Sequence, residues 1–389
     1  MTPAGTMRPE FDRVQKRALV VGIIGILALL AVFAITRDVG HFFQSYLFAF
    51  IFWNGLTIGC LGLYLLHNVV GGNWGVVIRR FLEAGTRTLP ITLILFIPVL
   101  IGVHQIYPWA QPGSHMKAAY LNVPFFTGRA AFYFALWMFW GFRLLKLSGE
   151  QDRTGDPGQA IQLRMKAFAP LGLLLFVVTT SFAFIDWVMS LEPDWFSTIY
   201  GWLFTVGQTL QTFAFCIILL IILAPKKPFL GLVKIQHFHD LSNLMLAFTM
   251  LWAYMSLSQF LIIWAENLPE EIPWYVRRFS GGWGVIAVMV ALFHFALPFF
   301  LLLMRFIKRN PKYLYWVACW MFAVRILADF WMIEPAFRRK GLEVFWTDPL
   351  AFVGIGGIWI AAFAWRLKER PLLPLHDPRL GYHPVETEV

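Results

Sequence analysis

Residues 42–66 of this chain, FFQSYLFAFIFWNGLTIGCLGLYLL, contain no charged side chain and decide the class of fold. A helix rises about 1.5 Å per residue, so this stretch is long enough to cross the ~30 Å hydrocarbon core of a membrane. Similar runs recur along all 389 residues, of which 59% are hydrophobic and 14% are charged. Soluble domains have about 45–50% and 25%. The composition therefore predicts an all-α, polytopic membrane protein.

The apolar runs predict ten transmembrane helices. The first of them follows several basic residues, as in a secretory signal peptide, but no A-x-A cleavage site comes after it. We therefore interpret it as a retained helix. The predicted spans are approximately 18–35, 42–66, 88–107, 125–147, 167–191, 197–223, 241–265, 282–306, 312–333 and 348–367.

Basic residues are distributed unevenly between the two sets of predicted loops. Of the 32 lysines and arginines, 23 fall in one set, which includes both termini and the loop around 79–87, and 7 fall in the other. Lysine and arginine concentrate on the cytoplasmic side of membrane proteins. Both termini are therefore predicted to be cytoplasmic. The net charge of +10 reflects this topology, and we expect no nucleic-acid partner.

Two predicted helices end in similar segments, which suggests an internal repeat or a chance similarity in an aromatic-rich chain. The segments are Asp186-Trp187-Val188-Met189-Ser190-Leu191-Glu192-Pro193 and Asp329-Phe330-Trp331-Met332-Ile333-Glu334-Pro335. A repeat predicts two four-helix bundles plus two peripheral helices. The units are 1–41 (N-terminal tail and first helix), 42–193 and 194–335 (the two bundles), and 336–389 (last helix and cytoplasmic tail). Small residues at 354–361 predict close helix packing or a docking face for a partner subunit.

Ionisable residues inside the predicted spans need a partner or a function, because a charge in hydrocarbon costs several kcal/mol. Arg325 and Asp329 are four residues apart and face the same side of one helix. They form either a structural ion pair or, with His294 near mid-membrane, part of a proton relay. Asp186 has no cation within four residues on its own helix, so it is either protonated or paired across helices. We predict a relay of Asp186, His294, Arg325 and Asp329.

His104 and Arg129 are predicted near the outer ends of their helices, where they could converge with Asp186. They are the candidate quinol contacts. The competing interpretations are a hydrogen-bonded interfacial histidine and an arginine that extends to the outer interface.

The sequence predicts no metal or cluster site. Its three cysteines lie singly in apolar runs, without a C-x-x-C motif. Haem ligation by two histidines needs a pair at matched depth on facing helices, and the predicted spans offer no buried pair. We therefore expect no redox centre in this chain.

Two segments resemble hallmark segments of a multi-pass membrane subunit of alternative complex III, a quinol:electron-acceptor oxidoreductase. They are residues 184–198, FIDWVMSLEPDWFST, and residues 254–271, YMSLSQFLIIWAENLPEE. The ten-span layout is also similar to that membrane subunit. More distantly, the chain resembles the polysulfide-reductase membrane-anchor (NrfD-like) superfamily.

This resemblance implies a membrane subunit of a respiratory or photosynthetic quinol:acceptor oxidoreductase in the bacterial cytoplasmic membrane. Its partners would be a homologous sister subunit, iron–sulfur and c-type haem subunits, and lipids. The implied roles are contact with quinone or menaquinone and proton translocation. Two alternatives come from other classes: an ion or substrate transporter, and a purely structural anchor. Paired spans of transporters often share a helix-breaking proline, whereas Pro98, Pro170 and Pro298 have no counterparts here.

Overall fold

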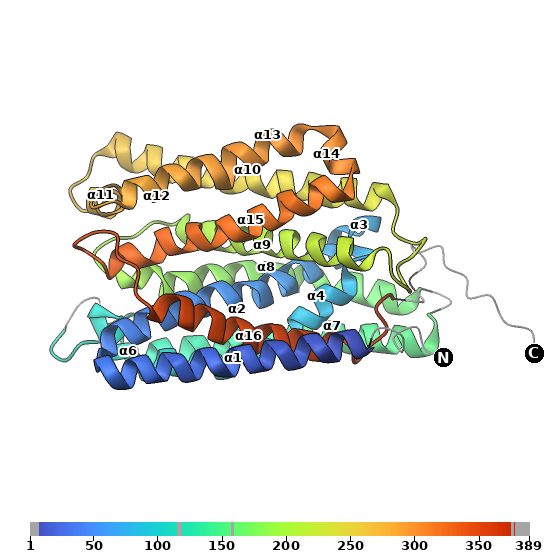
Figure 1. Cartoon of the computed structure of the whole chain (residues 1–389), viewed down its shortest axis with the longest axis horizontal. Helices are drawn as coiled ribbons and strands as arrows, with labels where there is room; N and C mark the ends of the chain where they lie inside the picture. The colour runs from blue at the N-terminus through green and yellow to red at the C-terminus, as the bar shows by residue number, and fades with distance from the viewer. Residues whose placement is uncertain (1–7, 115–118, 157–158, 375–376, 378–389) are drawn as a thin grey trace, which may run out of the picture.

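The central element of the fold is helix α2 (Val39–Val70), which contains the apolar stretch 42–66. The computed structural model describes residues 8–114, 119–156, 159–374 and 377. Within these residues the chain forms a bundle of long helices that run side by side (Figure 1). The apolar window of α2 is 94% buried, whereas that of α1 (Arg8–Thr36) is 17% buried. Helices α1 and α2 are both apolar, but α2 lies in the protein core, whereas the exposed apolar surface of α1 needs lipid around it.

Nine helices of the described part are long and apolar enough to span a membrane. Each overlaps one of the predicted spans. Besides α1 and α2 these are α7 (Val123–Thr154), α8 (Ala160–Trp187), α9 (Tyr200–Leu223), α10 (Ile235–Glu266), the segment Trp283–Leu303, α15 (Pro311–Ile333) and α16 (Thr347–Leu367). The chain is thus a multi-pass helical membrane protein.

The predicted span at 88–107 is not one straight helix. The chain instead forms α4 (Arg79–Thr86) and α5 (Leu89–Ile101), which meet at a bend of 42°, followed by the short α6 (Val103–Ile106). Pro90 explains the bend, because its ring would clash with the carbonyl of Thr86 in a continuous helix. The number of spans becomes ten only if α4 and α5 count as one bent span.

The segment Trp283–Leu303 changes its helical geometry in the middle. It consists of α12 (Trp283–Val290), a π-helical stretch at Ala291–Ala296, and α13 (Leu297–Leu303). Pro298 has no N–H to donate to the carbonyl of His294, and its ring would crowd that carbonyl. The π-helical stretch ends just before this proline, and such stretches are frequent at functional sites.

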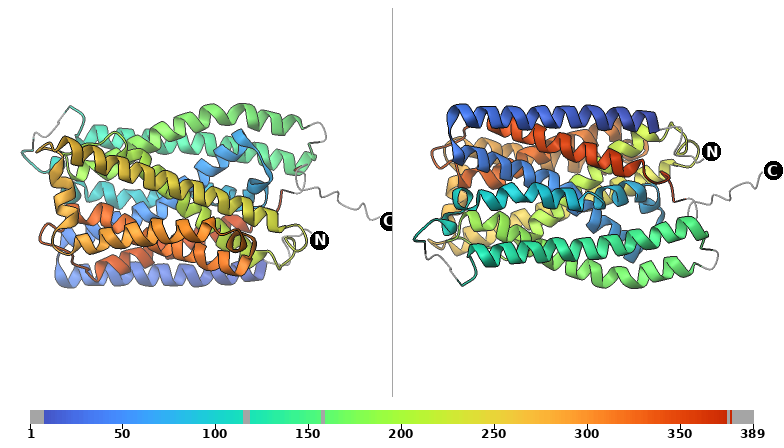
Figure 2. Two further views of the ribbon diagram at one scale, coloured as in Figure 1. Left: turned by 90° about the horizontal axis from the view of Figure 1, so that it is seen from above. Right: turned by 90° about the horizontal axis from the view of Figure 1, so that it is seen from below.

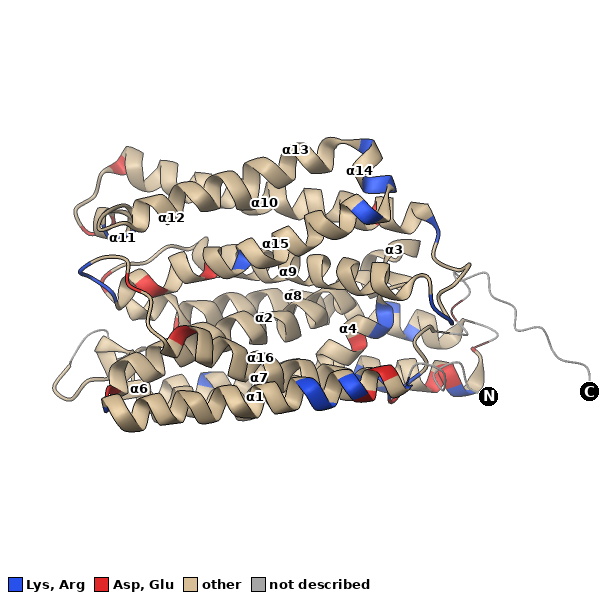
Figure 3. Ribbon diagram, viewed as in Figure 1, with Lys and Arg blue, Asp and Glu red and all other residues tan. Residues whose placement is uncertain are grey.

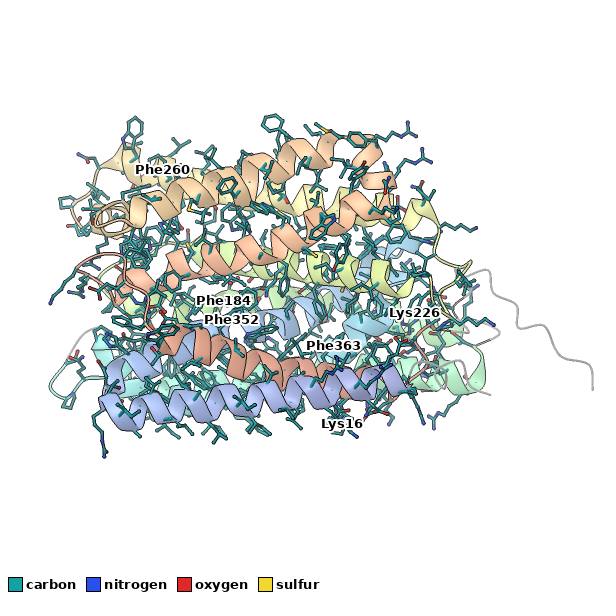
Figure 4. The ribbon with its side chains drawn as sticks, in the orientation of Figure 1. Lys16, Phe184, Lys226, Phe260, Phe352 and Phe363 are labelled. Carbon is teal, nitrogen blue, oxygen red and sulfur yellow. The ribbon has the colours of Figure 1, made fainter. Side chains whose placement is uncertain are left out.

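The helices pack in a continuous chain of neighbours. Helix α2 packs against α5, α8, α9 and α16, while α7 packs against α5 and α8. Helix α9 contacts α10 and α15, and α13 packs against α10. Aromatic side chains lie between the helices: Phe363 of α16, labelled in Figure 4, packs against Phe215 of α9 and against Trp359 of its own helix.

Helix α1 lies along α16 on the outside of the bundle (Figure 2). Their backbones approach closely, since a Cβ atom added at Gly357 would lie 2.5 Å from the Cα of Gly22. Gly25 and Gly354 face each other in the same way. The small-residue face predicted on the last span is therefore covered by α1 of the same chain at these glycines, and the alternative that a partner subunit docks there is wrong.

We expect Gly357→Ala to destabilise the protein by about 1–3 kcal/mol, because the added methyl group cannot fit against the α1 backbone. Gly128→Ala in α7 is the matched control, since a Cβ atom there would meet nothing within 4 Å and alanine favours the helix. Thermal unfolding of both variants in detergent checks this. Equal stability of the two variants would show that α1 is not held at these glycines.

Charged residues gather at the two ends of the helices (Figure 3). Helix α1 begins and α16 ends at the same end of the bundle (Figure 1). Few charged residues lie along the middle of the helices, and those few form the clusters described next.

Candidate functional site

The first cluster consists of Asp186, Arg129 and Tyr133, and is called the outer cluster after the predicted position of Asp186 and Arg129 near the outer ends of their helices. Asp186 is in the last turn of α8 and is completely buried. Its two carboxylate oxygens accept hydrogen bonds from Nε and Nη2 of Arg129, both at 2.8 Å. Tyr133 Oη donates a third hydrogen bond to Asp186 at 2.8 Å. Asp186 is therefore the acceptor in a bidentate ion pair that joins α7 to α8.

All three guanidinium nitrogens of Arg129 donate to acceptors within the protein. The third, Nη1, donates to the carbonyl of Tyr120 at 2.9 Å, and the guanidinium lies 3.8 Å from the ring centroid of Tyr120. The interpretation in which Arg129 extends to the outer interface is wrong, because the side chain turns to Asp186. Of the two possibilities for Asp186, pairing across helices is the one observed.

His104 does not join the outer cluster. Its side chain is exposed, and Nδ1 lies against the carbonyl of Ala110 in its own loop. Convergence of His104 with Asp186 is therefore wrong. Tyr133 was missed from the sequence, although its position four residues after Arg129 placed it on the same helix face.

The second cluster, called the central cluster, consists of Arg325, Asp329, Gln208 and His294. Arg325 Nη2 donates to Asp329 Oδ1 at 2.5 Å within α15, so the predicted ion pair forms. Gln208 of α9 lies beside the Asp329 carboxylate. The Arg325 guanidinium packs against Gly207 of α9, in space that a larger residue there would fill. A Cβ atom added at Gly207 would lie 2.3 Å from Nη1 of Arg325. Arg325 is 3% exposed and Asp329 is 0% exposed.

Polar atoms in the central cluster outnumber their partners. Among the described residues, Asp329 Oδ2, Arg325 Nε and both amide atoms of Gln208 accept or donate no hydrogen bond of normal geometry. Asn54 of α2 precedes Gly55, where an added Cβ atom would lie 1.7 Å from Oε1 of Gln208. Neither amide atom of Asn54 has a hydrogen-bond partner among the described residues. Buried polar atoms rarely stay unpaired, and water molecules usually satisfy them. These unpaired atoms are where bound water would be expected.

His294 lies in the π-helical stretch and is completely buried. Neither of its ring nitrogens has a hydrogen-bond partner in the described part of the chain. Its ring stands edge-on to Trp252 with 4.3 Å between centroids, and the Arg325 charge acts on it electrostatically. His294 is therefore buried inside the bundle, and its part in a relay with Arg325 and Asp329 stays a prediction.

Several polar side chains of α10 lie away from this cluster. Tyr254 is 68% exposed on the outside of α10, and Ser256 donates to the carbonyl of Trp252 in its own helix. Gln259 accepts from Ser197 Oγ at 3.0 Å. That bond joins the two segments 184–198 and 254–271. Trp195 of the first segment also stacks on Trp274, which lies three residues after the second, with 4.7 Å between ring centroids.

A third cluster, called the inner network, was not recognised in the sequence. Glu83 of α4 accepts from Arg79 Nε at 3.0 Å, from Arg80 Nη1 at 2.6 Å and from Ser148 Oγ at 2.6 Å. Arg370 lies 3.4 Å from the same carboxylate. Arg79 and Arg80 are 1% and 3% exposed, so their interpretation as residues of a basic loop is wrong. They pack inside the protein because α4 is buried throughout its length.

In the part of the chain that the structure describes, no group of three or more His, Cys, Asp or Glu residues could hold a metal ion. Cys60 and Cys216 are buried free thiols. The absence of haem and clusters stays a prediction. No protein-family model and no curated protein matches this sequence.

Proposed function

We propose that this chain is a membrane subunit of a quinol:electron-acceptor oxidoreductase, in which it moves protons and carries no redox centre of its own. The observation that carries this proposal is the central cluster. A histidine, an ion pair and a glutamine lie buried among apolar helices, with polar atoms that have no hydrogen-bond partner in the described part of the chain. Side chains that can hold and release protons along such a path are typical of proton-transfer proteins.

The resemblance of segments 184–198 and 254–271 to alternative complex III supplies the oxidoreductase part of the proposal. These segments meet at one end of the bundle, where Glu192 pairs with Arg278 Nη1 at 2.8 Å. A cavity of about 300 Å³ there is lined by residues of both segments. We propose this end as the outer face, which places iron–sulfur and c-type haem subunits against it.

Quinol contact is the less well supported part. A groove of about 750 Å³ lies between α2, α8, α9 and α10, and most of its lining side chains are apolar. It suits an isoprenoid tail better than a quinol headgroup, which needs hydrogen-bond partners. We therefore assign proton movement to this chain first, and quinone or menaquinone binding second, with His104 and Arg129 as weak candidates.

The proposal also includes the finer architecture: ten spans with α4–α5 as one bent span, two four-helix bundles with α1 and α16 outside them, and both termini in the cytoplasm of a bacterium. Helix α2 packs against α5 and α8 of its own proposed bundle and also against α9 of the other bundle and α16, so the two bundles would share one continuous core.

Purification of the affinity-tagged chain in its native complex tests the function. We expect a homologous membrane subunit and subunits with iron–sulfur clusters and c-type haem to co-purify, and quinol to reduce an acceptor with release of protons. A tagged, unrelated multi-pass protein from the same membrane is the control. A chain that purifies without redox partners and moves ions in proteoliposomes would instead be a transporter.

A further inference from the structure

A cavity of about 310 Å³ lies away from the outer and central clusters, where α16 ends. It is formed by Arg87 in the turn between α4 and α5, by α7, and by the end of α16 with the segment after it. Four of its six lining residues are cations. The lining residues are Arg87, Phe142, Leu145, Lys146, Arg366 and Arg370.

Cations outnumber carboxylates around this cavity. Glu369 forms ion pairs with both Arg87 and Arg366, and its Oε1 lies 3.2 Å from Nη1 of Arg366. Arg370 forms an ion pair with Glu83, which also pairs with Arg79 and Arg80. Lys146 is exposed, and no ion pair of its ammonium group is found in the described ranges. The cavity therefore carries an unbalanced positive charge.

Apolar surface lies next to these cations. Phe142 lines the cavity and is 40% exposed on α7, and Trp365 is 39% exposed on α16. The Arg366 guanidinium lies 3.9 Å from the Trp365 ring centroid. Exposed tryptophan next to arginine at the end of an apolar helix is typical of the membrane–water interface. An occupant of this cavity can therefore place an anionic group among the cations and an apolar chain along Phe142.

We infer that this cavity binds the phosphodiester headgroup of an anionic phospholipid, with the acyl chains against the apolar surface of α7. Basic pockets between transmembrane helices bind anionic headgroups in this way. Arginine supplies paired N–H donors for phosphate oxygens, and Lys146 supplies a charge that has no competing carboxylate. A zwitterionic lipid would bring a second positive charge close to four cations and bind more weakly.

Titration of the purified full chain in detergent with phosphatidylglycerol, followed by native mass spectrometry, tests the inference. Removal of one cation near an anionic group weakens binding about five-fold, so Lys146→Gln should weaken phosphatidylglycerol binding about five-fold and Lys146→Glu about 25-fold. Because Lys146 is exposed and contacts no carboxylate, neither variant should impair folding. The matched controls are Lys312→Gln and Lys312→Glu, at an exposed lysine outside the cavity, which should leave binding unchanged.

Two further ligands separate the sources of the anion. Phosphatidylcholine with the same acyl chains should bind at least ten-fold more weakly than phosphatidylglycerol. The soluble headgroup glycerophosphoglycerol should bind weakly, because it lacks the chains that cover Phe142. Equal binding of the two lipids, equal effects at Lys146 and Lys312, or tight binding of the soluble headgroup would each overturn the inference.

Discussion

The Glu83→Gln variant is expected to lose about 5 kcal/mol of its free energy of unfolding. The substitution keeps the shape of the side chain and removes its charge. Glu83 is the shared carboxylate of Arg79, Arg80 and Arg370, and the first two are buried. Removing one partner of a buried ion pair leaves an uncompensated charge, which costs about 3–5 kcal/mol. Arg79 keeps Asp377 and Arg80 keeps Asp152 as second partners, but all three guanidinium groups share Glu83, so we expect the upper end of this range.

Glu150→Gln is the matched control for this prediction. The Glu150 side chain is 34% exposed and lies 3.4 Å from Arg164, and an exposed ion pair contributes less than about 1 kcal/mol. Unfolding of the purified variants in mixed micelles, followed by tryptophan fluorescence, gives the two values. Glu83→Asp, which keeps the charge, should fall between them. If Glu83→Gln is as stable as Glu150→Gln, the inner network does not hold α4 in place.

The His294→Phe variant is expected to assemble normally and to lose quinol-driven proton release, with turnover lowered about 100-fold or more. Phenylalanine keeps a ring of similar size against Trp252. His294 makes no hydrogen bond in the described part of the structure, so an apolar ring there costs little stability. The loss of activity would then report proton transfer and not folding.

Leu292→Phe is the control for His294→Phe, because Leu292 lies in the same π-helical stretch and is 50% exposed. It should retain full turnover and proton release. Both variants are compared by the haem and iron content of the purified complex and by the ratio of protons released to quinol oxidised. Turnover of His294→Phe within two-fold of the unmodified complex would remove His294 from the proposed relay.

The Asp186→Asn and Asp329→Asn variants separate a loss of proton transfer from a loss of folding less well. Each aspartate pairs with an arginine, Arg129 or Arg325, so either change leaves a charge without its partner. A loss of function could then follow from a loss of structure. Asp186 has no cation within four residues on its own helix, so the sequence alone does not show that a change there would leave Arg129 without its partner.

Features that depend on local spacing could be predicted from the sequence alone. The apolar runs predict the nine long helices, and the four-residue spacing of Arg325 and Asp329 predicts their ion pair, because both partners lie on one helix face. Hydropathy also placed His294 within its helix. Helix α4 was missed because the charged residues Arg79, Arg80 and Glu83 make 79–87 look like a loop, although Pro90, which explains the bend after it, is visible.

Only the tertiary structure decided which distant side chains meet. Arg129 and Asp186 are 57 residues apart, and Arg79 and Asp377 are 298 apart. Hydropathy assigns every such cation to an interface, because it measures composition along the chain and contains no information on packing between helices. The sequence therefore determined a helical membrane protein and its local ion pair. Helix packing decided that Arg79, Arg80 and Arg129 are internal, because each meets a carboxylate that only the folded chain brings within hydrogen-bonding distance.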